Sequence, residues 1–155
     1  MPGKQPTLFT SARAEGRPAM AVRAVASASM LRKTVRVEPA ALGKLCFSWK
    51  VPALIEGADL TQRDGDDSPV RVVLAFEGDR SRFSAKNAML SELALALTGE
   101  ELPYATLMYV WGNHRAAGSV IINPRTDRIR KLVLESGAWP AQPLAGLRAR
   151  HSRRL

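Results

Sequence analysis

Apolar and polar residues alternate along most of this chain, and the alternation has the two-residue period of β-strands. The segment 44–51 alternates most regularly, because every second residue from Leu45 to Val51 is apolar, and Pro52 follows it as a stop signal. Less regular apolar segments predict further strands at 7–10, 19–26, 30–37, 70–77, 104–112, 119–122 and 128–135. Turn residues separate these segments, and such a series of short strands predicts an all-β fold, an antiparallel β-sandwich.

One segment, 84–98, breaks this pattern and predicts a helix. Its apolar residues recur every four positions from Met89 to Leu97, Ser84 supplies an N-cap, and Gly99 closes the C-terminus. We expect this amphipathic stripe to cover an open edge or end of the sandwich. The alternative is a helix that binds a partner protein.

Charge and composition exclude several classes of protein. The net charge is +9, but 138–155 holds four arginines and no acid, which leaves 19 basic and 14 acidic residues and a net charge of +5 elsewhere. Few aromatic residues accompany these charges, so we expect no nucleic-acid partner.

No apolar run reaches the about 18 residues of a membrane span. The first ten residues show no signal peptide, and the single cysteine, Cys46, permits neither an intramolecular disulfide nor a cysteine-based zinc site.

The acidic turn Gly65-Asp66-Asp67 is the segment with the most evident chemistry. Two adjacent carboxylates on a glycine turn are hard oxygen ligands, so Asp66 and Asp67 predict a possible Ca²⁺ site or a hydrogen-bonding site for sugar hydroxyls. The structural alternative is that one of the two carboxylates caps its own turn and pairs with Arg71.

Aromatic and acidic residues in the later strands suggest two further ligand contacts. Trp111, with Trp49, Tyr104 and Tyr109, could offer flat faces for sugar rings, although packing in the core explains the tryptophans as well. Glu135 could form a glycosidase-type acid pair with an aspartate of the acidic turn, but a simple exposed position explains it equally. The chain has two histidines in all, which nearly excludes a histidine-dependent triad or a multi-histidine metal site.

Five motifs in sequence order give the chain a family resemblance. They are V-A-S-A-S-M-L (25–31), L-C-F-S-W-K-V-P (45–52), G-D-D-S-P-V-R-V (65–72), L-P-Y-A-T-L-M-Y-V-W (102–111) and N-P-R-T-D-R-I-R-K-L-V-L-E-S-G (123–137). Over about residues 4–137 the chain resembles domain of unknown function 3047. The resemblance implies a bacterial, periplasmic or secreted, jelly-roll-like β-sandwich without an established activity.

The composition also divides the chain into three parts. We expect a loose lead-in at 1–18, an incomplete β-sandwich domain at 19–137 and a disordered tail at 138–155 that is translated out of frame. After Gly137 the strand pattern stops, and permitted codons read one base later give a tryptophan-containing acidic segment of the kind that the resemblance leads us to expect there. On this prediction Trp139 carries no function, and C-terminal strands are missing.

The leading functional hypothesis is a non-catalytic binding module of the bacterial envelope, with a polysaccharide or another envelope component as its partner. This hypothesis rests on an analogy with other proteins of the jelly-roll fold, and on no particular residue of this chain. A carboxylate-dependent glycan hydrolase and a structural or assembly module are the alternatives. Apart from the possible Ca²⁺, no cofactor is expected, and the sequence leaves the oligomeric state open.

Overall fold

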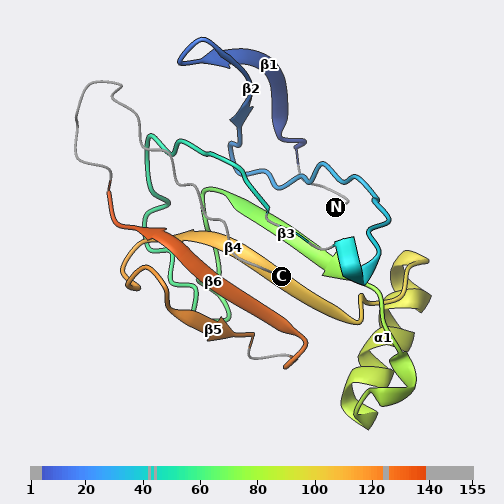
Figure 1. Cartoon of the computed structure of the whole chain (residues 1–155). Coiled ribbons are helices and arrows are strands. Elements are labelled where there is room, and N and C mark those ends of the chain that lie inside the picture. Colours follow the sequence, from blue (N-terminus) through green and yellow to red (C-terminus); the bar gives the residue numbers. More distant parts are fainter. Residues whose placement is uncertain (1–4, 42, 44, 124–125, 139–155) are drawn as a thin grey trace. The chain divides into compact units, whose positions relative to one another are not determined.

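The computed structural model describes residues 5–41, 43, 45–123 and 126–138. The chain is largely β, with a two-stranded and a four-stranded sheet and one α-helix (Figure 1). It divides into two compact units with the boundary between Trp49 and Lys50. This boundary falls inside the segment that the sequence assigns to a single domain.

The N-terminal unit contains a β-hairpin. Strands β1 (Leu8–Ala14) and β2 (Arg17–Arg23) pair in antiparallel fashion over their whole length. The turn between them has positive φ angles at Glu15 and Gly16, 53° and 75°, and glycine adopts this left-handed conformation at little cost. The expected loose lead-in therefore contains a complete strand.

Two predicted strands, the second of which crosses into the next unit, are wrong. The segment 30–37 has no strand, and the described residues from 45 to 51 form none, although their alternation is the most regular in the sequence. Leu45, Phe47 and Trp49 are half-buried between exposed neighbours, so the side chains do alternate. Phe47 and Trp49 pack edge to face with ring centroids 5.0 Å apart. A strand also needs backbone partners, and no strand of the described chain pairs with this segment.

The second unit is built on a four-stranded sheet in the order β3-β4-β6-β5. Its strands are β3 (Arg71–Phe76), β4 (Ala105–Gly112), β5 (Val120–Ile122) and β6 (Ile129–Ser136). The predicted strands and the predicted β5–β6 hairpin are confirmed, although residues 124–125 of its turn lie outside the described chain. However, β4 and β6 run parallel, because short β5 reverses the chain between them. The sheet is thus mixed, whereas the sequence predicts purely antiparallel pairing.

The predicted helix is confirmed as α1 (Ala85–Thr98), together with both of its caps. The Ser84 hydroxyl accepts a hydrogen bond from the Asn87 amide at 3.3 Å, and Gly99 ends the helix with a φ of 75°. The segment before the helix includes the short 3-10 helix η2 (Arg80–Arg82). Gly78 precedes it, and a Cβ atom there would lie 2.5 Å from the Tyr104 ring, so only glycine fits.

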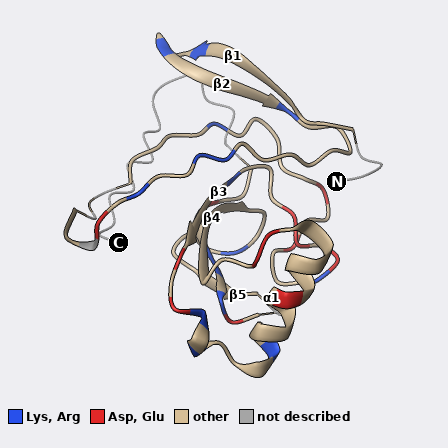
Figure 2. Ribbon diagram, turned by 90° about the vertical axis from the view of Figure 1, so that its right-hand side faces the viewer, with Lys and Arg blue, Asp and Glu red and all other residues tan. Residues whose placement is uncertain are grey.

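The orientation of α1 differs from the expectation. The helix buries polar Asn87 and Ser91, which are 4% and 5% exposed, whereas Leu93 and Leu97 are 53% and 75% exposed. The inward side chains make specific hydrogen bonds, and the Ser91 hydroxyl accepts one from the Leu102 amide. α1 contains two charged residues, Lys86 and Glu92, both exposed, and the rest of the helix is uncharged (Figure 2). The apolar stripe from Met89 to Leu97 is therefore exposed and, contrary to the prediction from the sequence, does not cover an open edge or end of the fold.

The core of the second unit lies between the sheet and the loop that precedes β3. Leu60 of that loop packs with Val110 of β4 and Val133 of β6, and Met108 and Ile121 border them. All three central side chains are at most 3% exposed. Among the described residues, no helix is long and apolar enough to cross a membrane.

Candidate functional site

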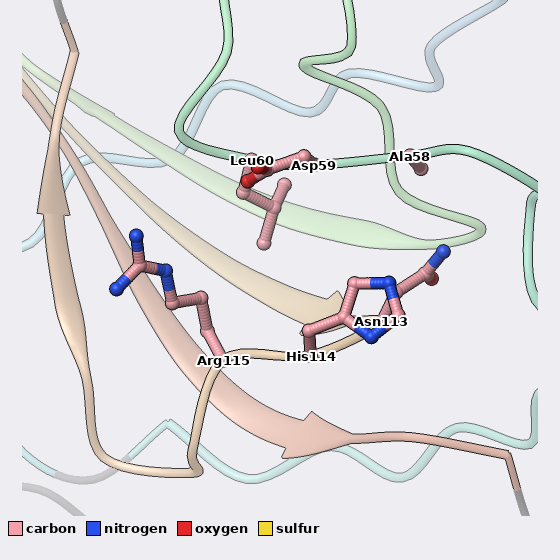
Figure 3. A pocket seen from close by; sticks show the side chains of 6 residues that line it. All are labelled: Ala58, Asp59, Leu60, Asn113, His114 and Arg115. Carbon is pink, nitrogen blue, oxygen red and sulfur yellow. The ribbon is translucent and has the colours of Figure 1, made fainter.

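A pocket of about 330 Å³ lies where the loop before β3 meets the end of β4. One wall consists of Ala58, Asp59 and Leu60, and the other consists of Asn113, His114 and Arg115. Figure 3 shows Asp59 and Leu60 across the pocket from His114 and Arg115. A carboxylate, an amide, an imidazole and a guanidinium thus surround a small apolar patch from Ala58 and Leu60.

The strand β4 positions the second wall. Its last residue, Gly112, lies against the core, since a Cβ atom there would be in ordinary van der Waals contact with Val133 at 3.4 Å and with Leu60 at 3.5 Å. The chain leaves the sheet directly after this glycine, and Asn113 follows. The Asn113 amide nitrogen donates a 2.7 Å hydrogen bond to the Ile55 carbonyl and ties the end of β4 to the loop.

A buried lysine holds the first wall. Lys131 lies in the middle of β6 and is 1% exposed, and its Nζ donates a 3.1 Å hydrogen bond to the Leu60 carbonyl. The same ammonium forms a short hydrogen-bonded ion pair with the Asp66 carboxylate. A buried ammonium needs such partners, because desolvation strongly penalises an unpaired charge. We name this arrangement of Lys131, Leu60 and Asp66 the lysine latch.

Asp59 is a negative charge in the pocket wall. Its Oδ1 accepts hydrogen bonds from the Thr61 amide at 2.9 Å and from the Thr61 hydroxyl at 2.7 Å. The amide bond, then the hydroxyl bond, and then the positive fields of Arg115 and His114 lower the pKa of Asp59. Asp59 is therefore ionised at neutral pH and acts as a hydrogen-bond acceptor.

The structure brings three residues of the predicted site together. Arg71 donates to the Asp66 carbonyl at 2.9 Å, and its guanidinium lies 3.7 Å from the Asp66 carboxylate and 3.5 Å from that of Asp67. Asp67 also accepts a 2.8 Å hydrogen bond from the Ser68 amide. The structural alternative, a capped acidic turn paired with Arg71, is therefore present.

The predicted Ca²⁺ ligands face cations of the protein itself. Arg71 approaches Asp66 and Asp67, and Lys131 pairs with Asp66, so two positive charges match two negative charges. Among the described residues, no group of three or more histidine, cysteine or acidic side chains is placed to hold a metal. Calcium binding at these carboxylates stays a prediction, and the ion would have to displace both cations.

The other two predicted site residues lie apart from the pocket lining. Trp111 is 3% exposed, and its indole nitrogen donates a 3.1 Å hydrogen bond to the Gly137 carbonyl, so the ring packs as a core residue. Glu135 is half-buried in β6, opposite Trp111 in the strand register. Within the described chain, no hydrogen bond or ion pair joins Glu135 to Asp66 or Asp67, as an acid pair in contact would require.

Sequence reasoning missed most of the pocket. The sequence pattern does not single out Asp59, Asn113 or Arg115, and it indicates Lys131 only as part of a strand. A signal existed for the second wall, because three polar residues follow an apolar strand directly at Asn113-His114-Arg115. A signal existed for Lys131 as well, since strand alternation places it on the same face as Val133.

The comparisons with known proteins agree with the resemblance. No curated protein and no solved structure matches this chain. A family model described as "Protein of unknown function (DUF3047)" matches residues 1–145. The match continues past Gly137, the residue after which the sequence predicts an out-of-frame tail. Apart from Ala138, that tail lies outside the described residues. The chain therefore belongs to the DUF3047 family of proteins of unknown function.

Proposed function

We propose that this protein is a non-catalytic binding module of the bacterial cell envelope that holds carbohydrate in the pocket between Asp59 and Arg115. The observation that carries the proposal is the pocket itself, in which four polar side chains of different hydrogen-bonding type surround about 330 Å³. Small-molecule sites begin at about 300 Å³ and orient their ligands with a few polar groups of this kind. Donors and acceptors placed side by side suit the hydroxyl groups of a sugar.

The ionisation of Asp59 supports binding rather than hydrolysis. Glycoside hydrolysis normally requires two carboxyl groups, one of which is protonated and has a raised pKa. Among the residues that line the pocket Asp59 is the one carboxylate, and its pKa is lowered. The hydrolase alternative would require a second, protonated carboxyl group, and none lines this pocket among the described residues.

The proposal places the protein in the periplasm or outside the cell, on the resemblance that its motifs carry. It also retains a jelly-roll-like sandwich as the fold, to which the mixed sheet of the second unit would contribute one layer. A crystal structure of a family member tests this part, because a second sheet packed on β3, β4 and β6 is required.

The experiment is a pull-down with a panel of insoluble bacterial polysaccharides, combined with a reducing-sugar assay. We expect binding to at least one polysaccharide without release of reducing ends. Asp59→Asn should weaken that binding. The matched control is Asp79→Asn, because Asp79 accepts the same pair of hydrogen bonds, from the Ser81 amide and hydroxyl, outside the pocket. Released sugar would contradict the non-catalytic proposal, and equal loss in both variants would contradict the site.

A further inference from the structure

We infer that the pocket selects a carboxylated sugar, a ligand with one negative charge beside its hydroxyl groups. The inference rests on the proposed function and narrows its ligand class. It concerns the charges on the two walls, which lie on opposite sides of the pocket (Figure 3).

The first observation is the state of Arg115. Arg71 pairs with Asp66 and Asp67, and Arg80 pairs with Glu77 and Glu101. In contrast, no hydrogen bond or ion pair of the described chain involves the exposed Arg115 side chain. A guanidinium at a pocket wall is a planar double donor that matches a carboxylate.

The second observation is the charge opposite Arg115. Ionised Asp59 and the two basic side chains, Arg115 and His114, act on one another electrostatically, since both basic residues lower the pKa of Asp59. They nevertheless lie too far apart for an Asp59–Arg115 ion pair, because none occurs within 4.0 Å among the described residues. The pocket thus keeps its opposite charges separated.

A ligand that fills this space must offer binding groups to both walls of the pocket. Its anionic group belongs beside Arg115 and His114, and hydrogen-bond donors belong beside Asp59. A sugar acid carries both, with several bonds between the carboxylate and the far hydroxyls. A phosphate dianion fits less well, because its second charge meets repulsion from Asp59. An amino acid carries its two charges close together, so it would fit a site whose two oppositely charged side chains are adjacent, and here they lie on separate walls.

The test is calorimetric titration of the full chain with glucuronate, its uncharged methyl ester, glucose, inorganic phosphate and alanine. We expect glucuronate to bind about tenfold more tightly than the methyl ester, because a charge-assisted hydrogen bond contributes this much. Arg115→Met should abolish the difference, and Arg115→Lys should keep part of it. Arg130→Met is the matched control, since Arg130 is an exposed arginine of β6 outside the pocket lining.

Each other outcome decides against the inference. Equal binding of glucuronate and its ester, with Asp59→Asn weakening both, would overturn the charge selection and leave the proposed function standing. Tighter binding of phosphate or alanine than of glucuronate would overturn the ligand class. Absence of sugar binding here, together with a polysaccharide panel that also fails, would overturn the inference and the proposed function together.

Discussion

Two sets of polar side chains attach different pieces of chain to β6 and to the turn that precedes it. At one place the lysine latch joins the loop before β3 to β6 through a pair of opposite charges. At the other, Asn87 of α1 donates a 2.8 Å hydrogen bond to Asp127, and its amide oxygen accepts a 2.9 Å bond from Thr126. The first site contains a buried ammonium and the second a neutral amide, so the two should differ in what their loss costs.

The difference also concerns function. The lysine latch holds the Leu60 backbone, and Leu60 and Asp59 form a wall of the candidate pocket. The amide attachment holds α1 beside Arg128, whose guanidinium lies over the rings of Phe83 and Tyr104 at 5.2 and 4.7 Å. Breaking the latch should therefore affect the pocket as well as stability, whereas loss of the amide should affect stability alone.

The largest expected effect comes from Asp66→Ala. The variant leaves the Lys131 ammonium buried with the Leu60 carbonyl as its remaining partner. Removal of one partner of a buried pair costs about 3–5 kcal/mol in the free energy of unfolding. Urea denaturation of the variant and of the native chain measures this loss in the free energy of unfolding.

Lys131→Met should cost less than Asp66→Ala. The carboxylate that it leaves is 21% exposed and keeps Arg71 within 3.7 Å. The double variant should recover part of the loss of Asp66→Ala, because no unpaired ammonium remains. Strictly additive losses of the two single variants would show that the latch is not an ion pair in solution.

Asn87→Ala should have the next largest effect. It leaves the buried Thr126 hydroxyl and the Asp127 carboxylate without this partner, and an unsatisfied neutral group costs about 1–3 kcal/mol. Urea denaturation again gives the change, and affinity for any ligand of the pocket should stay unchanged. A loss as large as that of Asp66→Ala would remove the distinction between the two attachments.

A smaller effect should appear in the pH dependence. The hydrogen bond from Asn87, with further contributions from the backbone and from Arg128 and Lys86, lowers the pKa of Asp127 below its ordinary value of 3.8. A lowered pKa in the folded state stabilises the fold above about pH 3.8, and this contribution disappears as the pH falls through the folded-state pKa. Asp127→Asn should therefore melt earlier than the native chain at neutral pH. The difference between their melting temperatures should shrink below pH 3.8, and a constant difference would contradict the assignment.

The smallest effect is expected on the outer face of α1. Leu97 is 75% exposed, so Leu97→Gln should change the free energy of unfolding by less than about 0.5 kcal/mol. A loss above about 2 kcal/mol in the same denaturation experiment would show that the apolar stripe is covered in solution, as the sequence pattern predicts.

The sequence predicts those elements whose signals are local. Ser84 and Gly99 delimit α1 because caps act within one turn of the chain, and the hairpin β5–β6 follows from adjacent apolar segments. The strand predicted at 44–51 is wrong because alternation indicates that the segment has two faces, but it does not show that a backbone partner is present. The prediction of which face of α1 points inward is wrong because Asn87 forms its hydrogen bonds with Thr126 and Asp127, about forty residues away. No local pattern shows such a contact.

The candidate site shows the same limit more strongly. Asp66, Asp67 and Arg71 are close in sequence, and the sequence predicts their grouping as one of two alternatives. The pocket joins Asp59 to Arg115, which are far apart along the chain, and the lysine latch joins Leu60 to Lys131. Only the folded sheet brings such residues together.

The most direct test of the account is a map of backbone amide chemical shifts as the best-binding sugar from the panel is added to the full chain. We predict that the largest shift changes fall at Ala58–Leu60 and Asn113–Arg115, the two walls of the pocket. Small changes should follow at Lys131, which holds the first wall. Largest changes at Asp66 and Asp67, or along the outer face of α1, with none at either wall, would contradict the central claim that this pocket is the binding site.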